Sequence, residues 1–285
     1  MLDQSPRFGL TAAERLAREH FGIDGRASAL TSERYQNFLI RGSDGARVVL
    51  KVANAAEERS MLEAQQRAIT HLAARLDSTP RVLSTVNGRA LVETTTPEGV
   101  THLIWAISWL DGVPLSSVRR RSMALFADLG RQVGALQREL IDFDHPGLHR
   151  DFYWDLANAR RIIGERRSLV ADASLVALVD QLVARIDRHA IPRLAAVRRA
   201  IIHGDLNDAN ILVGGGADLE TRNQSVVGIV DFGDMVYSYR VGELAIAIAY
   251  AMLDRDDPLG VASAIVRGYC ERSSLDDDEL AALYG

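Results

Sequence analysis

The first 110 residues are dominated by short apolar runs, each bounded by residues that favour turns. Runs of about four to eight such residues predict β-strands rather than helices. The predicted strands are 29–31, 38–41, 47–53, 81–86, 89–93 and 103–110. Asn87-Gly88 lies between the fourth and fifth runs and favours a type I′ hairpin turn there. The pattern therefore predicts an antiparallel sheet of about five strands.

Helices accompany these strands where apolar residues recur every three or four positions. The first is predicted at 11–21, with Thr11 as its N-cap and Glu14 completing a capping box. The second is predicted at 55–76. Its inward stripe consists of Met61, Gln65, Ala68 and Leu72.

The strand pattern stops near residue 110, and the rest of the chain is mainly helical. Apolar faces predict helices at 126–140 and 175–190, and 242–253 is apolar almost all round, as a core helix would be. The basic run 119–121 before the first of these helices is interpreted as a solvated face. This change of pattern predicts an α+β fold of two lobes, residues 1–107 and 108–285.

Composition narrows the classes of protein that fit this pattern. The chain has 285 residues, 47% of them hydrophobic, which is enough to bury the cores of two lobes. Its formal net charge of −5 gives no general attraction to nucleic acid or to an anionic membrane, so neither is expected as a partner. The single cysteine excludes an internal disulfide and a multi-thiolate zinc site. Because no signal peptide or bilayer-spanning stretch is recognisable, we expect a cytoplasmic protein.

A polar loop between two apolar runs is the strongest sign of a functional site. The segment 200–213 begins and ends with runs that predict short buried strands. Between them, His203, Asp205 and Asn210 have the spacing His-x-Asp-x-x-x-x-Asn of catalytic loops in phosphoryl-transfer enzymes. In such a loop the aspartate meets the attacking hydroxyl and the asparagine binds a metal ion. We therefore predict that Asp205 is the catalytic residue and that Asn210 is a metal ligand.

A second motif ends the next apolar strand. Residues 226–230 lead into Asp231-Phe232-Gly233, which supplies the second metal ligand in these enzymes. Asp231 and Asn210 both offer oxygen atoms, the ligands that Mg²⁺ prefers. His203 and Phe232 are expected to pack as structural support rather than to react. The chain contains no Gly-x-Ser-x-Gly motif of a serine hydrolase.

Lys51 is the only lysine in a chain that otherwise uses arginine for positive charge. It lies on the predicted strand 47–53, where phosphoryl-transfer folds place a lysine that pairs with nucleotide phosphates. A compact ammonium fits where a planar guanidinium would be too large. Gln65 can reach back toward this lysine, and Glu58 and Glu63 are the competing partners.

The same lobe is expected to hold the rest of the nucleotide. The polar connection 32–37 lies where a phosphate-covering loop would be, which makes Ser32 and Asn37 predicted phosphate contacts. An ordinary hairpin connection fits this segment equally well. Near the lobe boundary, the backbone at Ser108 and Leu110 is expected to hydrogen-bond the base.

Acidic residues around the catalytic loop are candidates for holding a cationic amine of the acceptor. They are Asp208, Asp234, Glu243 and Asp155. Two of them have an alternative role: Asp208 can cap the local turn, and Glu243 can accept hydrogen bonds from backbone N–H groups.

The sequence resembles the aminoglycoside phosphotransferase and choline kinase branch of the kinase-like fold over nearly its whole length. It most resembles the hydroxylysine-kinase-like group and the kinase modules of chains that also contain a class III aminotransferase. The segments that carry the resemblance are 32–38, 49–52, 203–210, 231–235 and the run from 242. The resemblance implies a two-lobed protein-kinase-like fold, Mg²⁺, ATP or GTP, and a small hydroxylated acceptor such as hydroxylysine or a related amino acid.

The function that follows is that of a small-molecule kinase, a phosphotransferase with an alcohol group as acceptor. The alternative is a catalytically silent nucleotide-binding module that regulates a larger protein. Related enzymes carry further helices beyond the point at which this chain stops. We therefore expect a piece of a longer protein, with further domains and part of the acceptor pocket outside it.

Overall fold

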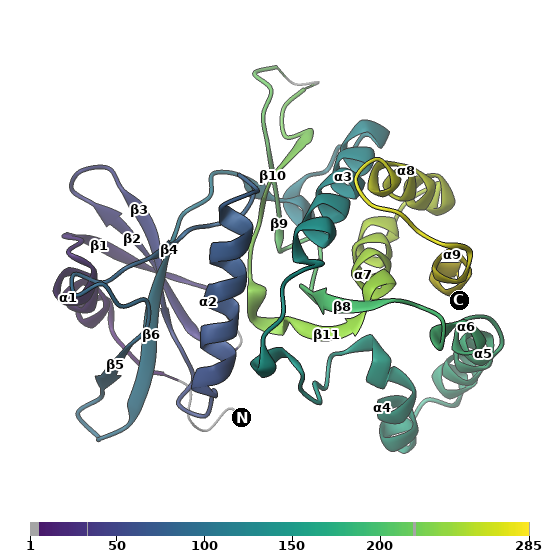
Figure 1. The fold of residues 1–285 in the computed structure, drawn as a ribbon, viewed down its shortest axis with the longest axis horizontal. Coiled ribbons are helices and arrows are strands. Elements are labelled where there is room, and N and C mark those ends of the chain that lie inside the picture. Colours follow the sequence, from purple (N-terminus) through teal and green to yellow (C-terminus); the bar gives the residue numbers. More distant parts are fainter. Residues whose placement is uncertain (1–5, 33, 219–220, 285) are drawn as a thin grey trace. The chain divides into compact units, whose positions relative to one another are not determined.

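The structure is a computed structural model that describes residues 6–32, 34–218 and 221–284 (Figure 1). The chain divides into two compact units, Met1–Asp111 and Gly112–Gly285. This division lies slightly beyond the boundary expected at residues 107 and 108. The last strand of the first unit runs through Ser108, and the Trp109 N–H still donates to the Arg47 carbonyl at 3.0 Å.

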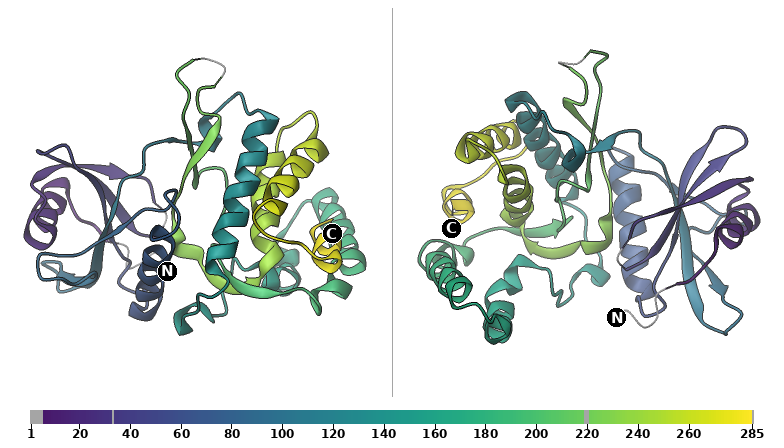
Figure 2. Two further views of the ribbon diagram at one scale, coloured as in Figure 1. Left: turned by 45° about the horizontal axis from the view of Figure 1, so that its top comes forward. Right: turned by 180° about the vertical axis from the view of Figure 1, so that it is seen from behind.

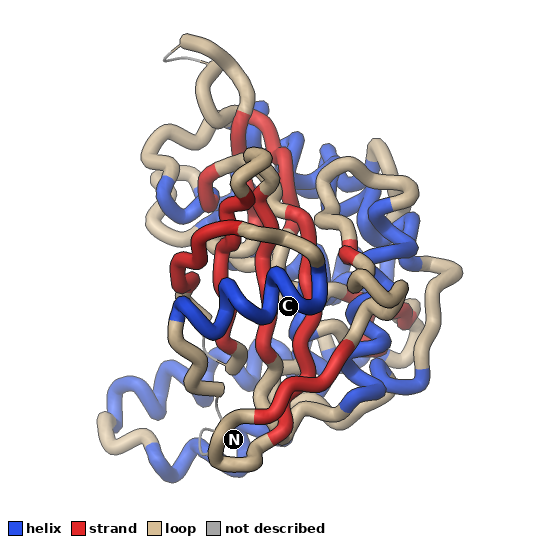
Figure 3. Tube along the Cα trace, turned by 90° about the vertical axis from the view of Figure 1, so that its left-hand side faces the viewer, coloured by secondary structure: helices blue, strands red, loops and turns tan. Residues whose placement is uncertain are grey.

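The first unit is built on one antiparallel sheet. Its strands are β1 (Gly25–Leu30), β2 (Gln36–Gly42), β3 (Arg47–Val52), β4 (Val82–Leu83), β5 (Val92–Thr95) and β6 (Thr101–Ser108). They pair in the order β1-β2-β3-β6-β4, and β5 also pairs with β6, which makes six strands among the described residues. Figure 3 shows the helix α1 (Leu10–Phe21) crossing in front of these strands. The antiparallel sheet predicted for the first lobe is confirmed, with six strands instead of about five.

The strand pair expected around Asn87-Gly88 is reduced to a tight turn, in which the Thr85 N–H donates to the Arg89 carbonyl at 2.6 Å and the Gly88 N–H donates to the Thr85 carbonyl at 2.9 Å. β4 pairs with Ala106 and Ile107 while β5 pairs with residues 101–104, so both lie along one edge of β6 rather than against each other. At the turn only Gly88 has a positive φ, of 73°, whereas a type I′ turn requires it at Asn87 as well. The eight residues of β6 offer both short strands a continuous row of backbone partners.

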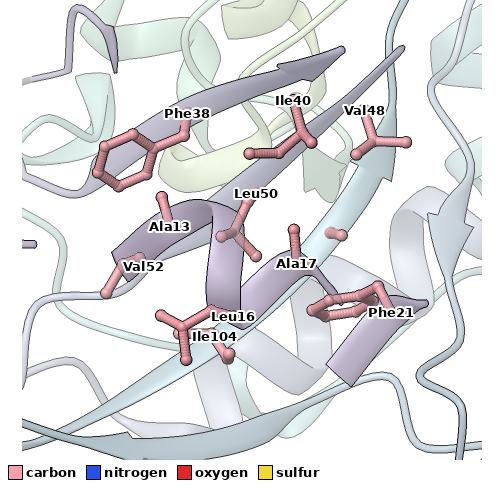
Figure 4. Packing of buried hydrophobic residues seen from close by; sticks show 11 residues of the cluster. Ala13, Leu16, Ala17, Phe21, Phe38, Ile40, Val48, Leu50, Val52 and Ile104 are labelled. Atoms are coloured by element: carbon pink, nitrogen blue, oxygen red, sulfur yellow. The ribbon is translucent and has the colours of Figure 1, made fainter. Parts of the chain in front are cut away.

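The helix α1 closes an apolar core over one face of the sheet. Figure 4 shows Ala13, Leu16, Ala17 and Phe21 of α1 with Phe38, Ile40, Val48, Leu50, Val52 and Ile104 of the strands. Side chains alternate between the two faces along a strand. Lys51 therefore points to the face opposite to Leu50, Val52 and α1.

The capping box predicted for α1 is wrong. The N-cap of α1 is Gly9, and no side chain caps the helix there. Glu14 instead accepts a hydrogen bond from the Ala27 N–H at 3.1 Å and lies 3.7 Å from the Arg26 guanidinium. The carboxylate is engaged by β1, so it attaches the helix to the sheet rather than closing its own first turn.

The helix α2 (Arg59–Ala73) lies on the other face of the sheet (Figure 1). The predicted stripe is confirmed as buried, since Met61 is 3% exposed and Gln65, Ala68 and Leu72 are 0% exposed. Gln65 is thus an uncharged polar side chain placed inside the unit. It lies on the face toward which Lys51 points.

The second unit is mainly helical, as predicted, with small sheets among its described residues. Its helices are α3 (Met123–Leu140), α4 (Ala159–Arg166), α5 (Ala173–His189), α6 (Ile191–Leu194), α7 (Arg240–Met252), α8 (Pro258–Cys270) and α9 (Asp277–Tyr284). Its strands are β7 (Val113–Pro114), β8 (Arg199–Ile202), β9 (Ile211–Gly214), β10 (Ser225–Ile229) and β11 (Val236–Tyr239). The strands pair as β10-β9-β7 and as β11-β8. No helix in the described part of the chain is long and apolar enough to span a bilayer.

The helices α3 and α8 lie side by side (Figures 1 and 2) at a separation that requires glycine. A Cβ atom at Gly268 would lie 1.9 Å from the Ala127 carbonyl oxygen, and one at Gly130 would lie 1.9 Å from the Ile265 carbonyl oxygen. These neighbours are backbone atoms, which cannot rotate away as a flexible side chain could. The two helices therefore meet backbone to backbone.

Gly268→Ala is expected to lower the free energy of unfolding by about 1–3 kcal/mol, because the added methyl group overpacks the contact between α3 and α8. The matched control is Gly164→Ala in α4, where a new Cβ would meet nothing within 4 Å. That control is expected to be neutral or to stabilise by about 0.5–1 kcal/mol, since alanine favours helix. Urea unfolding measures both variants. Equal stability of the two would contradict the close contact.

Candidate active site

The polar loop 203–210 connects two strands that belong to different sheets. β8 ends at Ile202 and pairs with β11, whereas β9 begins at Ile211 and pairs with β10. Ile202 is 3% exposed and Ile211 is 1% exposed, which confirms that the loop is anchored by buried apolar residues at both ends. Both ends of the loop are therefore fixed, which limits the positions that its polar side chains can take.

Side-chain amides hold the Asp205 carboxylate in place. Asn207 Nδ2 donates to Asp205 Oδ1 at 2.8 Å, and Asn210 Nδ2 donates to Asp205 Oδ2 at 2.8 Å. Asn210 Nδ2 also donates to the Asp205 carbonyl at 3.0 Å. A carboxylate oxygen can accept more than one hydrogen bond, so these amides do not by themselves prevent Asp205 from accepting one from an acceptor hydroxyl.

The predicted metal ligands are linked through the backbone of neighbouring strands. The Val230 N–H donates to the Asn210 carbonyl at 3.0 Å, which brings Asp231 next to the strand that follows the loop. Asp231 has a left-handed backbone with φ of 62°, unusual for a residue other than glycine. Such strain is concentrated at functional positions. It turns the chain sharply at the end of β10.

The donor chemistry at these two residues fits Mg²⁺. The amide nitrogen of Asn210 is committed to Asp205, which leaves its Oδ1 as the atom that can bind a cation. A carboxylate and an amide oxygen are hard ligands, and Mg²⁺ is usually bound by one or two such groups together with water and phosphate oxygens. Among the residues described, no group of three or more His, Cys, Asp or Glu side chains could form a different metal site.

The turn after Asp231 is packed tightly against the catalytic loop. Gly204 has φ of +81°, and a Cβ atom there would lie 2.5 Å from the Asp234 carbonyl oxygen. Arg150 donates to the carbonyls of Gly233 at 3.1 Å and Met235 at 3.0 Å. The close approach of Gly204 holds the loop against the turn, and Arg150 fixes the backbone of the turn itself.

His203 and Phe232 lie inside this structure. Their ring centres are 4.7 Å apart, and His203 is 0% exposed. His203 Nε2 lies 3.0 Å from the Val230 carbonyl, and Nδ1 accepts a hydrogen bond from the Asp205 N–H at 3.3 Å. These contacts assign the ring proton to Nε2. The histidine joins the loop to β10, which is the geometry of a packing residue.

Glu243 is a fully buried carboxylate beneath the loop, in the first turn of α7. It accepts hydrogen bonds from the backbone N–H groups of His203 and of Gly204, the latter at 3.3 Å. Burial raises its pKa to about 7; the two hydrogen bonds lower this pKa and the negative charge of Asp205 raises it. The structure thus places Glu243 in the backbone-binding role that the sequence left open, rather than facing an acceptor.

The other acidic candidates are also engaged by neighbours. Asp155 is 8% exposed and accepts from the Ala157 N–H at 2.9 Å and from the Ser238 hydroxyl at 2.5 Å. It starts a short 3₁₀ turn before α4, so it is structural and no longer a candidate for the amine. Asp234, in the turn after Asp231, is 9% exposed.

Asp208 forms an ion pair rather than a turn cap. Arg121 Nη2 lies 3.2 Å from Asp208 Oδ2, and the side chains are 6% and 25% exposed. The interpretation of 119–121 as a solvated face is therefore wrong for Arg121. The turn is capped by Asn207, whose Oδ1 accepts from the N–H groups of Ala209 at 2.8 Å and Asn210 at 3.1 Å.

In the first unit, Lys51 is 4% exposed and lies beside aromatic rings. These rings were not predicted from the sequence. Lys51 Nζ is 5.5 Å from the ring centre of Tyr35 and 5.2 Å from that of Trp105. Gln65 does not reach Lys51: its Nε2 donates to the Tyr35 hydroxyl at 3.3 Å, and its Oε1 makes no hydrogen bond. Strand alternation was the available signal for Trp105, because it is the direct partner of Lys51 across β3 and β6.

Both competing carboxylates lie at the surface, whereas Lys51 is buried. Glu63 has a side chain 42% exposed and lies 4.0 Å from Arg59, and Glu58 precedes α2 at its exposed N-cap. Ser32 Oγ accepts from the Tyr35 N–H at 3.3 Å, which stabilises the connection to β2. Residue 33 of the predicted phosphate-covering loop lies outside the described residues.

Asn37 belongs to β2 rather than to that loop, and it is the direct partner of Lys51 across β2 and β3. At the other end of the sheet, the Ser108 N–H donates to the Arg81 carbonyl at 2.8 Å, and its hydroxyl accepts from the Arg81 N–H at 2.9 Å. These bonds occupy the N–H of Ser108, so its backbone can contact a base only through the carbonyl oxygen. The contact of the Leu110 backbone with the base stays a prediction.

The raised pKa of the buried Glu243 makes the free energy of unfolding depend on pH. Its folded pKa of about 7 exceeds the ordinary value of 4.5, so the folded chain binds more protons than the unfolded chain between these values. The contribution of Glu243 to stability is therefore present below pH 4.5 and is lost as the pH rises through 7. Relative to Glu243→Gln, the wild type is expected to lose about 3 kcal/mol of unfolding free energy over this range.

Urea unfolding of both proteins at pH 4.5, 5.5, 6.5 and 7.5 measures this difference. Any lost hydrogen bond in the glutamine variant gives an offset that is independent of pH. A difference that stays constant over the series would contradict the protonation of Glu243.

The chain is similar in sequence to known phosphotransferases. Residues 27–283 match the model of the phosphotransferase enzyme family (APH). The chain is 31% identical over 298 residues to the hydroxylysine kinase of Mus musculus, an alignment that covers 98% of this chain and 78% of that protein. It is 29% identical over 266 residues to the hydroxylysine kinase of Xenopus laevis, covering 87% of this chain and 71% of that one.

Solved structures show the same fold. An amicoumacin kinase in complex with AMP-PNP and Ca²⁺ matches with a TM-score of 0.73 at 14% identity, covering 97% of this chain and 81% of that chain. A microcompartment-associated aminopropanol kinase matches with a TM-score of 0.73 at 19% identity, covering 96% of this chain and 84% of that chain. The predicted protein-kinase-like fold is confirmed.

The predicted resemblance is confirmed, and so is a phosphotransferase that acts on an alcohol group. The family match, the hydroxylysine kinases and the aminopropanol kinase give no support to the alternative of a silent regulatory module. The chain belongs to the phosphotransferase enzyme family, as a small-molecule kinase.

Proposed function

We propose that the chain transfers the γ-phosphoryl group of ATP or GTP, with Mg²⁺, to the hydroxyl of a small amine-bearing acceptor such as hydroxylysine. The observation that carries this proposal is the Asp205 carboxylate, held on each oxygen by a side-chain amide in an anchored loop. The relatives in Mus musculus and Xenopus laevis that bear the name hydroxylysine kinase support the choice of acceptor.

Asp205 would accept a hydrogen bond from the acceptor hydroxyl and take its proton as the phosphorus–oxygen bond forms. Catalysis of phosphoryl transfer depends mainly on position and on charge, because the protein forms no covalent bond to the phosphoryl group. The hydrogen bonds from Asn207 and Asn210 fix the carboxylate before the acceptor arrives. This preorganisation is what the loop contributes to the rate.

Asn210 Oδ1 and the Asp231 carboxylate would hold the metal ion, which when bound neutralises charge on the phosphate oxygens. In the first unit, Lys51 would pair with the nucleotide phosphates. Leu39, Val49 and Ile107 form a row across β2, β3 and β6, on the same face as Lys51 and one pleat further toward Leu110. This apolar row is suited to the flat face of a base.

Asp208 and Asp234 remain the candidates for the amine of the acceptor. Asp155 and Glu243 are buried and bound by hydroxyl or backbone groups, so they are left out. The charge of Asp208 is partly offset by Arg121 at 3.2 Å. The acceptor itself is best identified by a screen of hydroxylated amines and amino acids with ATP and with GTP.

Asp205→Ala is expected to lower the rate of acceptor-dependent ADP or GDP release by about 10³-fold, because the hydroxyl loses its proton acceptor. The matched control is Asp172→Ala, which removes the N-cap of α5 and its 2.8 Å bond to the Ser174 N–H. This control is expected to lower stability by about 1 kcal/mol without changing turnover. Equal turnover of Asp205→Ala and wild type would contradict the kinase mechanism, whereas inactivity on hydroxylysine alone would remove only that acceptor.

Asp231→Asn is expected to raise the Mg²⁺ concentration for half-maximal rate by at least about tenfold, since the metal loses its carboxylate ligand. Titration of Mg²⁺ at a fixed, saturating nucleotide concentration measures this change. An unaltered Mg²⁺ dependence would contradict the assignment of Asp231 as a ligand.

A further inference from the structure

Glu279, in the first turn of α9, is a carboxylate with 0% exposure. It forms a reciprocal capping box with Asp276, the residue before the helix. The Glu279 N–H donates to Asp276 Oδ1 at 2.8 Å, and Glu279 Oε2 accepts from the Asp276 N–H at 3.2 Å. The start of α9 therefore orients this carboxylate independently of its other partners.

Arg198 and Arg240 share the Glu279 carboxylate. Arg198 Nε donates to Oε1 at 3.0 Å, and its Nη2 donates to Oε2. Arg240 is 4% exposed, and its Nε lies 3.4 Å from Oε1. Both guanidinium groups also donate to the Ser274 carbonyl, shortly before α9. The helix α9 and the turn before it therefore hold both arginines at one point.

These arginines begin the elements that hold the start of the catalytic loop. Arg198 directly precedes β8, which leads into the loop. Arg240 is the first residue of α7, and Glu243, one turn later, accepts the backbone N–H groups at the start of the loop. The Arg240 N–H also donates to the Arg198 carbonyl at 2.9 Å. Glu279 thus lies where the beginnings of β8 and α7 meet.

The position of Arg240 is unfavourable unless its charge is paired. A cation at the first residue of a helix lies at the positive end of the helix dipole, and burial removes the water that would solvate it. A buried ion pair adds little net stability compared with apolar side chains of similar size. Its retention here is explained by the geometry that it fixes, because a guanidinium and a carboxylate pair in defined orientations.

We propose that Glu279 is a positioning residue for phosphoryl transfer and acts on the catalytic loop through Arg198 and Arg240. These three residues are called the α9 clamp. The clamp holds the first residue of α7 against the start of β8, and Glu243 and β8 in turn place Asp205 for the acceptor hydroxyl. The proposal rests on the catalytic role proposed above for Asp205. It makes the docking of α9 a condition for turnover.

Hydrogen exchange of Glu279→Gln tests the clamp without an acceptor. The substitution keeps the shape of the side chain but removes its charge. The amides of His203 and Gly204 are expected to exchange about tenfold faster, while those of α8 stay unchanged, because only the support of the loop is loosened. Unchanged exchange at the loop, or an equal rise throughout the second unit, would overturn the proposal.

A paired substitution, Arg240→Met with Glu279→Met, covers the case in which Glu279→Gln does not fold. Removing one partner leaves a buried charge unpaired, whereas removing both replaces the pair with apolar side chains. The paired variant is expected to fold and to show the same faster exchange at the loop. A folded paired variant with wild-type exchange at His203 and Gly204 would overturn the proposal.

Kinetics with ATP, Mg²⁺ and hydroxylysine connect the clamp to catalysis. Glu279→Gln is expected to lower kcat about 10–100-fold, because a small displacement of Asp205 misaligns it with the hydroxyl. In the Asp205→Ala background the same substitution is expected to cause a much smaller loss. A loss of folded protein would instead lower both backgrounds by one factor, and that result would overturn the proposal.

Asp278→Asn is the matched control on the same helix. Asp278 lies 3.0 Å from Arg193 in a pair whose side chains are 39% and 53% exposed, so the pair contributes little. Loop exchange and kcat are expected to stay unchanged, and changes equal to those of Glu279→Gln would overturn the proposal. If the wild-type chain phosphorylates no acceptor, the proposed function fails while the exchange result still decides the clamp. If Asp205→Ala lowers turnover and Glu279→Gln does not, only the clamp fails.

Discussion

The position of the catalytic loop depends on the buried carboxylate of Glu243. Carrying a negative charge inside the unit is unfavourable, and this carboxylate is tolerated because it accepts backbone N–H groups of His203 and Gly204. Its place in the first turn of α7 also aligns it with the positive end of that helix. The loop is thereby tied to a core helix at its start, while β9 fixes its end. Asp205 lies between these two points.

The fixed loop positions the other site residues of the second unit. Asn210 orients Asp205 with its amide nitrogen and keeps its oxygen for a cation, so one side chain serves both the carboxylate and the metal. The strained backbone of Asp231 is held by neighbours on both sides, since Val230 bonds to Asn210 and Arg150 bonds to the carbonyl of Gly233. Packing thus maintains a geometry that the isolated turn would not adopt.

The sequence could predict features whose cause is local. Strand alternation placed Lys51 on the face away from the apolar core. The spacing of Asp205 and Asn210 identified the loop in which the structure shows these two side chains hydrogen-bonded to each other. The sequence could not predict contacts between segments that are distant along the chain. Arg121 and Asp208 are 87 residues apart in the chain, and Asp155 meets Ser238 across 83 residues, so no local pattern marked these carboxylates as occupied. The capping box failed for the same reason, because β1 engages Glu14.

The proposed reaction is the transfer of a phosphoryl group to a hydroxyl of a small amine. Phosphorus-31 nuclear magnetic resonance of a reaction with the wild-type chain, Mg²⁺, nucleotide and hydroxylysine tests it most directly, because it distinguishes a phosphomonoester from a phosphoramidate and from free phosphate. A new phosphomonoester signal is expected, growing in equal proportion to ADP or GDP. Nucleotide hydrolysis to free phosphate alone, with no phosphorylated product for any hydroxylated amine, would contradict it.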